Sequence, residues 1–290
     1  KQNAFGALPI QRTPVDEAVR ILRRAYEGGM RYFDTARAYS DSEEKLGEAF
    51  GTGFVNREEI VITSKTHAKT PEDFWAHLET SLALLKRDYI DIYQFHQAKQ
   101  CYRPGDGTGM YEAMLEFKAA GKIRHIGITA HILEVAEEAI ESGLYETLQF
   151  PFSYLSTDRD IALVKKCEEA GMGFIAMKGL SGGLLTNSKA CMAFMSQFDA
   201  LPIWGIQRQS ELDEWLSYFD NEVSMTEEIR AFIDKDRNEL LGEFCRGCGY
   251  CMPCPEEINI SLCARMSLWI RRFPTEPNMD ERTQEIMKKT

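Results

Sequence analysis

The chain has 290 residues and, at about 100–200 residues per domain, should form one large domain or two ordinary ones. Its 34 Lys and Arg against 45 Asp and Glu give a net charge of −11, which argues against binding to nucleic acid or an anionic membrane. Hydrophobic content of 44% and charged content of 27% exclude a disordered or fibrous chain. No apolar run approaches the ~18 residues of a membrane helix, and the N-terminus lacks a secretory signal. It also lacks an initiator Met, which is consistent with a missing leader.

Short apolar runs recur about every 30 residues, the length of one strand–helix unit, and we predict them to be strands. The first spans 3–9, and the others begin near Tyr32, Ile60, Tyr89, Arg124, Thr147, Gly173 and Leu201. Most are apolar on both faces, as expected for a parallel sheet covered by helices.

Amphipathic segments between these runs predict helices, of which two begin after Pro or Thr-Pro and four end at Gly. They are Val15–Glu27, Glu72–Lys86, Met110–Ala120, Leu133–Glu141, Arg159–Ala170 and Ser210–Phe219. Eight such units predict an α/β fold, a (β/α)₈ TIM barrel, over residues 1–219. A doubly wound sheet is the alternative, but it usually carries a Gly-rich fingerprint after its first strand, and none is present.

The composition changes after the predicted barrel. Residues 220–290 show helical patterns at Thr226–Leu241 and Ile260–Arg272 around a cluster of cysteines. We therefore predict a helical, cysteine-rich C-terminal extension packed on or beside the barrel.

Four residues of different chemistry fall at the predicted ends of successive strands. Asp34 ends the second strand, Tyr39 lies in the loop that follows, Lys65 ends the third strand and His96 the fourth. The active sites of (β/α)₈ barrels lie where strands end, so we expect these side chains to meet.

Such a set suits the reduction of a carbonyl group. A nearby ammonium should lower the pKa of a tyrosine, and a carboxylate should keep that ammonium charged. The tyrosine then becomes a proton donor for a developing alkoxide, while a neutral histidine orients the carbonyl oxygen. The hydride must come from elsewhere.

The segments FDTARAYSDSEEKLG, ITSKT, IYQFH and MKGLSGGLL resemble the aldo-keto reductase family in order and position, over roughly the first 220 residues. This resemblance implies a catalytic tetrad of Asp34, Tyr39, Lys65 and His96, with Tyr39 as the general acid. It also implies an NAD(P)H-dependent oxidoreductase acting on a small aldehyde or ketone.

The family binds NADPH, with NADH as an alternative, in extended form across the barrel mouth. The resemblance assigns the carboxamide to Thr129 and Gln149, the pyrophosphate to the loop 179–184, and the adenosine 2′-phosphate to the turn 205–209 with Arg208. The remaining matching positions are Met177, Lys178, Gly179, Leu180, Ser181, Gly182, Gly183, Leu184, Gly205 and Gln207. Glycines in that loop would also free backbone N–H groups for an anion.

Two positions depart from the family pattern. Met177 stands where an aromatic residue often stacks on the nicotinamide, and Ala130 stands where an Asn often follows the residue matching Thr129.

The eight cysteines are unevenly distributed. Four follow one another as Cys245-x₂-Cys248-x₂-Cys251-x₂-Cys254-Pro255, with Cys263 close behind. This spacing favours a [4Fe–4S] cluster over zinc, which prefers two separated cysteine pairs. A cluster of this kind, rather than a disulfide framework, indicates a cytoplasmic protein. Some aldo-keto reductases with ferredoxin-like extensions look similar, and members often carry a second cysteine motif. Its absence here means either an incomplete sequence or a single cluster, with Cys254 or Cys263 as the fourth ligand.

Several alternatives remain open at this level. His67 and His131 fit the site or an ordinary loop, while Cys101, Cys167 and Cys191 fit buried thiols. The cluster could serve an electron-transfer partner or only hold the tail together. The chain could also be a redox-sensing or electron-transfer protein that uses the barrel as a nucleotide-binding module.

Overall fold

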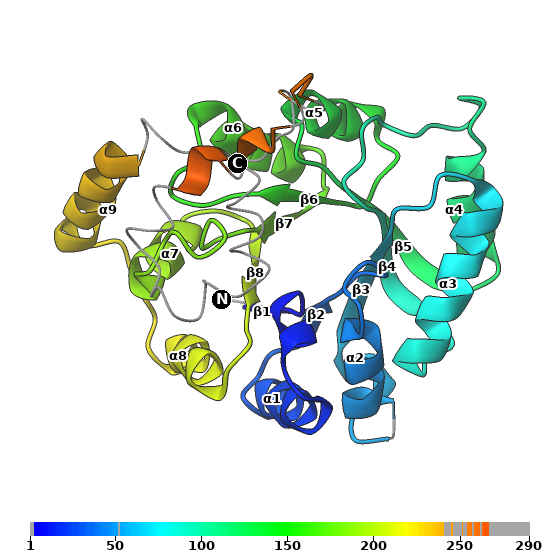
Figure 1. The fold of residues 1–290 in the computed structure, drawn as a ribbon, viewed down its shortest axis with the longest axis horizontal. Coiled ribbons are helices and arrows are strands. Elements are labelled where there is room, and N and C mark those ends of the chain that lie inside the picture. Colours follow the sequence, from blue (N-terminus) through cyan, green and yellow to red (C-terminus); the bar gives the residue numbers. More distant parts are fainter. Residues whose placement is uncertain are drawn as a thin grey trace.

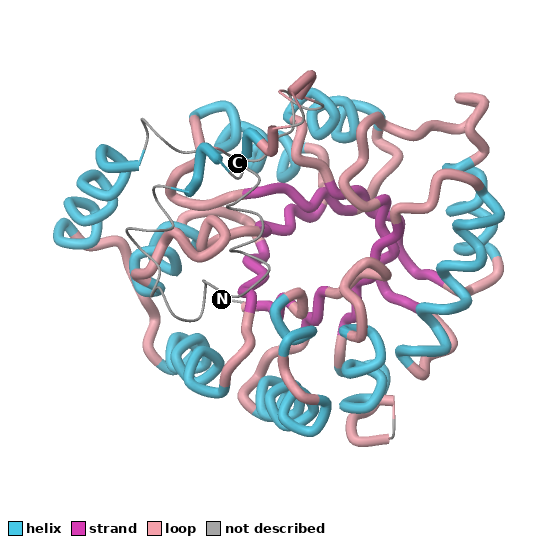
Figure 2. The backbone as a smooth tube through the Cα atoms, viewed as in Figure 1, coloured by secondary structure: helices cyan, strands magenta, loops and turns pink. Residues whose placement is uncertain are grey.

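The structure is a computed structural model that describes residues 3–51, 53–240, 245, 251, 254–256, 258–261 and 263–266. Eight parallel strands form a closed ring, in which β1 pairs with both β2 and β8 (Figures 1 and 2). They are β1 Ala4–Gly6, β2 Tyr32–Asp34, β3 Val61–Thr66, β4 Ile90–Phe95, β5 Ile123–Thr129, β6 Thr147–Pro151, β7 Gly173–Met177 and β8 Leu201–Gly205. The predicted (β/α)₈ barrel is confirmed, and the doubly wound alternative is excluded.

Helices surround the strand ring (Figure 2). They are α1 Val15–Glu27, α2 Ser42–Phe50, α3 Pro71–Leu85, α4 Met110–Ala119, α5 Leu133–Ser142, α6 Asp158–Glu169, α7 Ser188–Met195, α8 Gln209–Asp220 and α9 Glu227–Leu240. Short 3₁₀ helices, Pro9–Arg12 and Arg57–Glu59, precede α1 and β3. No helix in the described ranges is both long and apolar enough to cross a membrane.

Local sequence explains where most helices begin and which face they bury. In α3, Thr70 accepts a hydrogen bond from the Asp73 N–H at 3.2 Å, and Pro71 occupies the first turn. In α1, Ala18, Ile21, Leu22 and Ala25 are buried at helical spacing against the barrel. These boundaries agree with the predicted ones to within two residues.

Two helices, α2 and α7, were not predicted. The sequence of α2 is polar and shows no apolar stripe. Its residues Ser42, Glu43 and Lys45 are nevertheless buried, because their side chains are paired with other groups. Glu43 pairs with Arg37 and accepts a hydrogen bond from Ser64 at 2.6 Å. Nearly every residue of α7 is buried, so α7 shows no alternation between apolar and polar faces.

The predicted helix 226–241 is confirmed as α9, which packs against α7 (Figure 1). The Tyr154 hydroxyl donates to Asp236 at 2.6 Å, and Arg237 donates to the carbonyl oxygens of Tyr154 and Ser156. These bonds tie α9 to the loop between β6 and α6. Of the predicted helix 260–272, residues 260–261 and 263–266 are helical and the others lie outside the described residues.

Candidate active site

The two buried charges predicted at the strand ends form an ion pair. The Lys65 Nζ lies 2.8 Å from Asp34 Oδ2 and 2.5 Å from the Thr35 carbonyl oxygen. Both side chains are almost completely buried, at 1% and 3% exposure. Burial lowers the pKa of Lys65, but Asp34 and Tyr39 outweigh it and hold the pKa above its ordinary value, so the ammonium stays charged.

Tyr39 joins this pair from the loop after β2. The Lys65 Nζ lies 4.9 Å from the centroid of the Tyr39 ring and hydrogen-bonds with its hydroxyl. Burial raises the pKa of Tyr39, and although Lys65 opposes this, the pKa remains above its ordinary value. The ammonium lowers the pKa of Tyr39 as predicted, but burial of the phenol, which was not foreseen, raises it more. Tyr39 is a protonated hydroxyl at neutral pH.

His96, directly after β4, faces the same mouth. Its ring centroid lies 5.7 Å from that of Tyr39 with an edge-on geometry, and 4.0 Å from that of His67, which is stacked on it. Burial, followed by the nearby charge of Lys65, lowers the pKa of His96 to about 2. The imidazole is thus neutral, as predicted. Its Nδ1 atom is buried without a hydrogen-bond partner in the described part of the chain.

A line of polar groups crosses the barrel interior from β4 to β2. Gln94 donates to the Gln149 side-chain oxygen at 2.7 Å, and a hydrogen bond from Gln149 lowers the pKa of Asp34, although burial raises it more. Thr129 accepts from the Gln97 N–H at 2.7 Å and keeps its own O–H as a donor. The predicted carboxamide ligands Gln149 and Thr129 are therefore buried at the mouth and already oriented by protein partners.

The loop after β7 has an unusual backbone. Lys178 and Ser181 have φ of +58° and +49°, and Gly182 and Gly183 have φ of +73° and +93°. Trp204 fixes the start of the loop, since a Cβ on Gly179 would lie 2.5 Å from its indole ring. Two N–H groups of the loop are bonded within it, since Ser181 donates to the Lys178 carbonyl oxygen at 2.7 Å and Gly183 donates to that of Leu180 at 2.9 Å.

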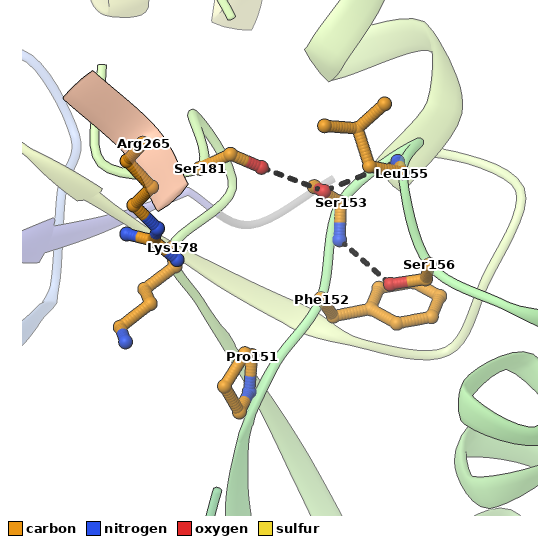
Figure 3. Close-up of a pocket in the computed structure, with 8 residues that line it drawn as sticks. All are labelled: Pro151, Phe152, Ser153, Leu155, Ser156, Lys178, Ser181 and Arg265. Atoms are coloured by element: carbon orange, nitrogen blue, oxygen red, sulfur yellow. Dashed lines mark hydrogen bonds between the residues drawn. The ribbon is translucent and has the colours of Figure 1, made fainter. Parts of the chain in front are cut away.

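A small pocket lies between this loop and the end of β6 (Figure 3). Ser153 and Ser181 form its wall, with their hydroxyl oxygens 3.0 Å apart, and Arg265 enters it from the C-terminal segment. Lys178 is exposed at this mouth, but surrounding protein and then the charge of Arg265 lower its pKa to about 8. The pocket is lined by Pro151, Phe152, Ser153, Leu155, Ser156, Lys178, Ser181 and Arg265.

At the predicted 2′-phosphate site, Arg208 is paired with a carboxylate of the protein. Arg208 is 72% exposed and binds Glu211 with two nitrogens, at 2.9 and 2.8 Å. Glu211 also accepts the N–H groups of Gln207 and Arg208 at the start of α8. A carboxylate thus occupies the position that a phosphate would take at this helix N-terminus.

The described residues include only some of the cysteines predicted to bind a cluster. Cys248 lies outside the described residues, whereas Cys245, Cys254 and Cys263 are half-buried and Cys251 is exposed. Across the described residues, no three His, Cys, Asp or Glu side chains gather as metal ligands. Burial raises the pKa of Cys167 to about 12 and also raises that of Cys191, as expected for inert thiols.

Sequence reasoning missed Arg265, Ser153 and Glu211. The tertiary fold brings Arg265 and Ser153 to the pocket. No motif or spacing in the sequence indicates that these residues belong there. Glu211 lies three residues after Arg208, the N-cap of α8, where a Glu often accepts the N–H of the cap residue, so a helix start predicted at Gln209 would have indicated it.

A model of the aldo/keto reductase family matches residues 3–202. The chain belongs to this family. Among curated relatives, the chain is 29% identical over 195 residues to the uncharacterized oxidoreductase YrpG of Bacillus subtilis, covering 58% of this chain and 59% of that protein. It is 34% identical over 142 residues to methylglyoxal reductase DkgB of Salmonella typhi, covering 47% and 51%. It is 29% identical over 198 residues to L-galactose dehydrogenase of Arabidopsis thaliana, covering 63% and 62%.

The matched part of the chain thus spans between 51% and 62% of the length of these relatives. Solved structures share its fold at low identity. The holo form of aldo-keto reductase AKR11C1 from Bacillus halodurans aligns with a TM-score of 0.68 and 20% identity, over 81% of this chain and 91% of that one. This likeness establishes the fold alone.

Proposed function

We propose that the protein is an NAD(P)H-dependent reductase that converts a small aldehyde or ketone to an alcohol. The observation that carries this proposal is the cluster at the barrel mouth, in which a buried Asp34–Lys65 pair supports a protonated Tyr39 beside a neutral His96. Membership of the family supports it, because its curated relatives include a reductase and a dehydrogenase.

The nicotinamide, when bound, would supply the hydride to the carbonyl carbon. The protein supplies the proton. Tyr39 holds a proton on its hydroxyl oxygen at neutral pH, and the charged Lys65 stabilises the phenolate that remains after the proton leaves. Asp34 keeps the Lys65 ammonium in position at 2.8 Å, in a site with almost no water.

His96 would orient the substrate. A neutral imidazole carries one N–H donor, which can bind the carbonyl oxygen without competing with Tyr39 as an acid. The His67 ring, stacked on His96 with centroids 4.0 Å apart, restrains the orientation of the imidazole. Both Tyr39 and His96 are half-buried, so a carbonyl compound can approach from the mouth.

The donors around the mouth fit a dinucleotide. Thr129 and Gln149 can face a carboxamide, and Lys178 at the start of the loop after β7, with a pKa of about 8, can pair with an anionic diphosphate at neutral pH. We propose NADP(H) as the cofactor, as the family resemblance implies, and NAD(H) as the alternative. Arg208 would have to leave Glu211 to bind a 2′-phosphate.

We also propose that residues 220–290 form an extension that binds an iron–sulfur cluster, on the spacing of Cys245, Cys248, Cys251 and Cys254. The described cysteines are not gathered as ligands, so the mechanism above contains no step through a cluster or an electron-transfer partner. Anaerobic purification with iron and zinc analysis and a visible absorption spectrum tests this proposal. Zinc in place of iron, or neither metal, would overturn it.

The test of the main proposal is oxidation of NADPH and NADH by a panel of simple aldehydes and ketones, followed by absorbance. We expect the Tyr39→Phe variant to lose about 10²–10⁴-fold in kcat, because it lacks the proton donor. Its dissociation constant for NADP⁺, measured by calorimetry, should stay close to that of the wild type. A wild type that binds nucleotide but reduces none of these carbonyls would instead favour a redox-sensing module.

A further inference from the structure

Tyr39 lies in the loop 35–41, between β2 and α2. The Arg37 N–H donates to the Lys65 carbonyl oxygen at 2.9 Å, so the loop begins against the strand that carries the lysine. The Tyr39 N–H donates to the Ala36 carbonyl oxygen at 3.0 Å, within the same loop. The position of the Tyr39 ring, whose centroid lies 4.9 Å from the Lys65 Nζ, therefore depends on how firmly the loop is held to β3.

The backbone directly after Tyr39 is strained. Ser40 has φ of +40°, in the left-handed region that residues with a side chain rarely adopt, and such a conformation persists only where surrounding contacts hold it. The Ser40 hydroxyl donates to Gln11 at 3.1 Å, and the Ser42 hydroxyl donates to the Ala7 carbonyl oxygen at 3.0 Å. Both bonds hold the loop to the segment after β1, so the side that faces Lys65 needs contacts of its own.

One buried carboxylate supplies contacts on that side. Glu43, in the first turn of α2, has a fully buried side chain. It forms an ion pair with Arg37, in the loop just before Tyr39, and accepts a hydrogen bond from the Ser64 hydroxyl at 2.6 Å. Ser64 directly precedes Lys65 on β3. The carboxylate thus joins the loop that carries the tyrosine to the strand that carries the lysine.

The charge of Glu43 gives these contacts their strength. An ionised carboxylate away from water is costly unless a partner neutralises it, and the guanidinium of Arg37, which is 23% exposed, does so. Hydrogen bonds to a charged group are also roughly twice as strong as those between neutral groups. A neutral amide in place of the carboxylate would keep an acceptor for Ser64 but lose the ion pair, so the loop would be held less firmly.

We propose that Glu43 is a positioning residue for the reaction, which holds the Tyr39 hydroxyl at the Lys65 ammonium. This inference rests on the proposed function, in which Tyr39 is the proton donor. A reacting group displaced by ~1 Å can lose about 10²-fold in rate, so a loosened loop should slow the proton transfer. Nucleotide binding should change little, because the candidate nucleotide ligands belong to β5, β6 and the loop after β7.

The test uses Glu43→Gln, which keeps the shape of the side chain and removes its charge. With NADPH and 4-nitrobenzaldehyde as probes, we expect kcat to fall about 10–100-fold, while KM and the dissociation constant for NADP⁺ stay within about twofold of the wild type. In a Tyr39→Phe background, adding Glu43→Gln should change the residual kcat by less than about twofold, because a residue that acts through the hydroxyl has no effect once the hydroxyl is gone. A merely structural role would lower kcat in both backgrounds.

Glu44→Gln is the matched control, since Glu44 is the next residue of α2, carries the same charge and is exposed. It should leave kcat within about twofold of the wild type. Crystal structures of the wild type and of Glu43→Gln give a readout that does not depend on activity. We expect the distance from the Lys65 Nζ to the centroid of the Tyr39 ring, 4.9 Å in the wild type, to be longer in the variant.

Thermal unfolding checks that each variant is folded. If Glu43→Gln does not fold, Ser64→Ala decides by the same measurements, with an expected fall in kcat of about two- to tenfold for one lost hydrogen bond. Wild-type kcat in the folded variant, a loss of kcat by the same factor with and without the Tyr39 hydroxyl, or an unchanged Tyr39 ring would each overturn the proposal. A wild type that reduces no carbonyl would refute the proposed function, and the measured distance would still decide whether Glu43 positions Tyr39.

Discussion

At the scale of single residues, the protonation states of Tyr39 and His96 set the expected pH dependence of the reaction. Burial raises the pKa of Tyr39, so the acid form persists past pH 10, and burial holds the pKa of His96 at about 2. Neither group should titrate between about pH 5 and pH 9, given these directions of shift. We expect the kcat/KM for carbonyl reduction, measured against pH in one mixed buffer, to be flat across this range.

A break near the ordinary histidine pKa of about 6.5 would contradict this expectation. His96→Gln tests whether such a break belongs to His96, since a break that persists in this variant must come from another group. A decline in activity well below pH 10 would show that Lys65 lowers the pKa of Tyr39 more than burial raises it.

The Asp34–Lys65 pair should also contribute strongly to stability. Asp34→Asn leaves the Lys65 ammonium buried without its carboxylate, and we expect the free energy of unfolding to fall by about 3–5 kcal/mol. Replacing both partners, as Asp34→Asn with Lys65→Met, should restore much of this loss. Urea denaturation measures each value.

The exposed pair Lys86–Glu48, with both side chains 40% exposed, provides the matched control. Glu48→Gln should change the free energy of unfolding by less than about 1 kcal/mol. If Asp34→Asn and Glu48→Gln lower the free energy of unfolding equally, burial does not strengthen the contribution of the Asp34–Lys65 pair to stability.

The sequence was sufficient to predict that Asp34, Tyr39, Lys65 and His96 lie together, because each occupies a strand end or the loop beyond it, and the barrel brings strand ends together. The sequence could not show whether burial or the ammonium dominates at Tyr39. That balance depends on how much water the closed mouth admits, which no local pattern records. The same reason explains why the pairing of Gln94 with Gln149 was not foreseen.

At the scale of elements, the start of α8 is where cofactor choice can be tested. Glu211 binds Arg208 and caps the helix, so a 2′-phosphate would meet a carboxylate there. Glu211→Gln keeps the capping acceptor but removes the charge. We expect it to strengthen NADP⁺ binding about two- to fivefold relative to NAD⁺, the scale of an exposed charge pair.

Asp213→Asn is the control for this change, because Asp213 lies on the same helix, carries the same charge and pairs with Arg24 instead. Calorimetry with both nucleotides gives the ratio of affinities for each variant. If both variants raise the ratio of NADP⁺ to NAD⁺ affinity by the same factor, only the overall charge of α8 matters. If neither variant changes this ratio, the 2′-phosphate binds away from Glu211.

Periodicity predicted elements well where one face is apolar and the other polar. α1 and α3 follow that rule, and their predicted boundaries are close to the observed ones. α2 and α7 break it in opposite ways. The buried face of α2 includes charged groups paired by the fold, and α7 is buried on nearly all sides. Neither gives a period that a sequence alone can reveal.

At the scale of the whole molecule, α9 connects the chain beyond the barrel to the mouth. Its Asp236 and Arg237 bind Tyr154 and Ser156, in the loop that also carries Ser153 of the pocket. Arg265 enters the same pocket from further along the chain. Two segments beyond residue 219 thus contact one region of the mouth. The predicted boundary at that residue marks a change in the sequence pattern, but the chain on its two sides packs together.

This connection predicts how the barrel and α9 share stability. Tyr154→Phe removes the hydroxyl that donates to the buried Asp236, and loss of such a charged hydrogen bond should cost about 1.5–3 kcal/mol. Because Arg237 still binds backbone oxygens, α9 should remain in place but open more often. We expect amide hydrogens of α9 to exchange faster in this variant, while those of β3, β4 and β5 keep their wild-type rates.

Tyr111→Phe supplies the matched control, since the hydroxyl of Tyr111 donates to the Leu144 carbonyl oxygen at 2.5 Å, away from α9. It should leave exchange in α9 unchanged. If Tyr154→Phe accelerates exchange throughout the barrel, α9 and the barrel open as one cooperative unit rather than separately. If exchange in α9 is unaffected, the bond between Tyr154 and Asp236 does not hold the helix. The hydrogen bonds from Arg237 to backbone oxygens would then hold it, and Arg237→Ala should accelerate exchange in α9.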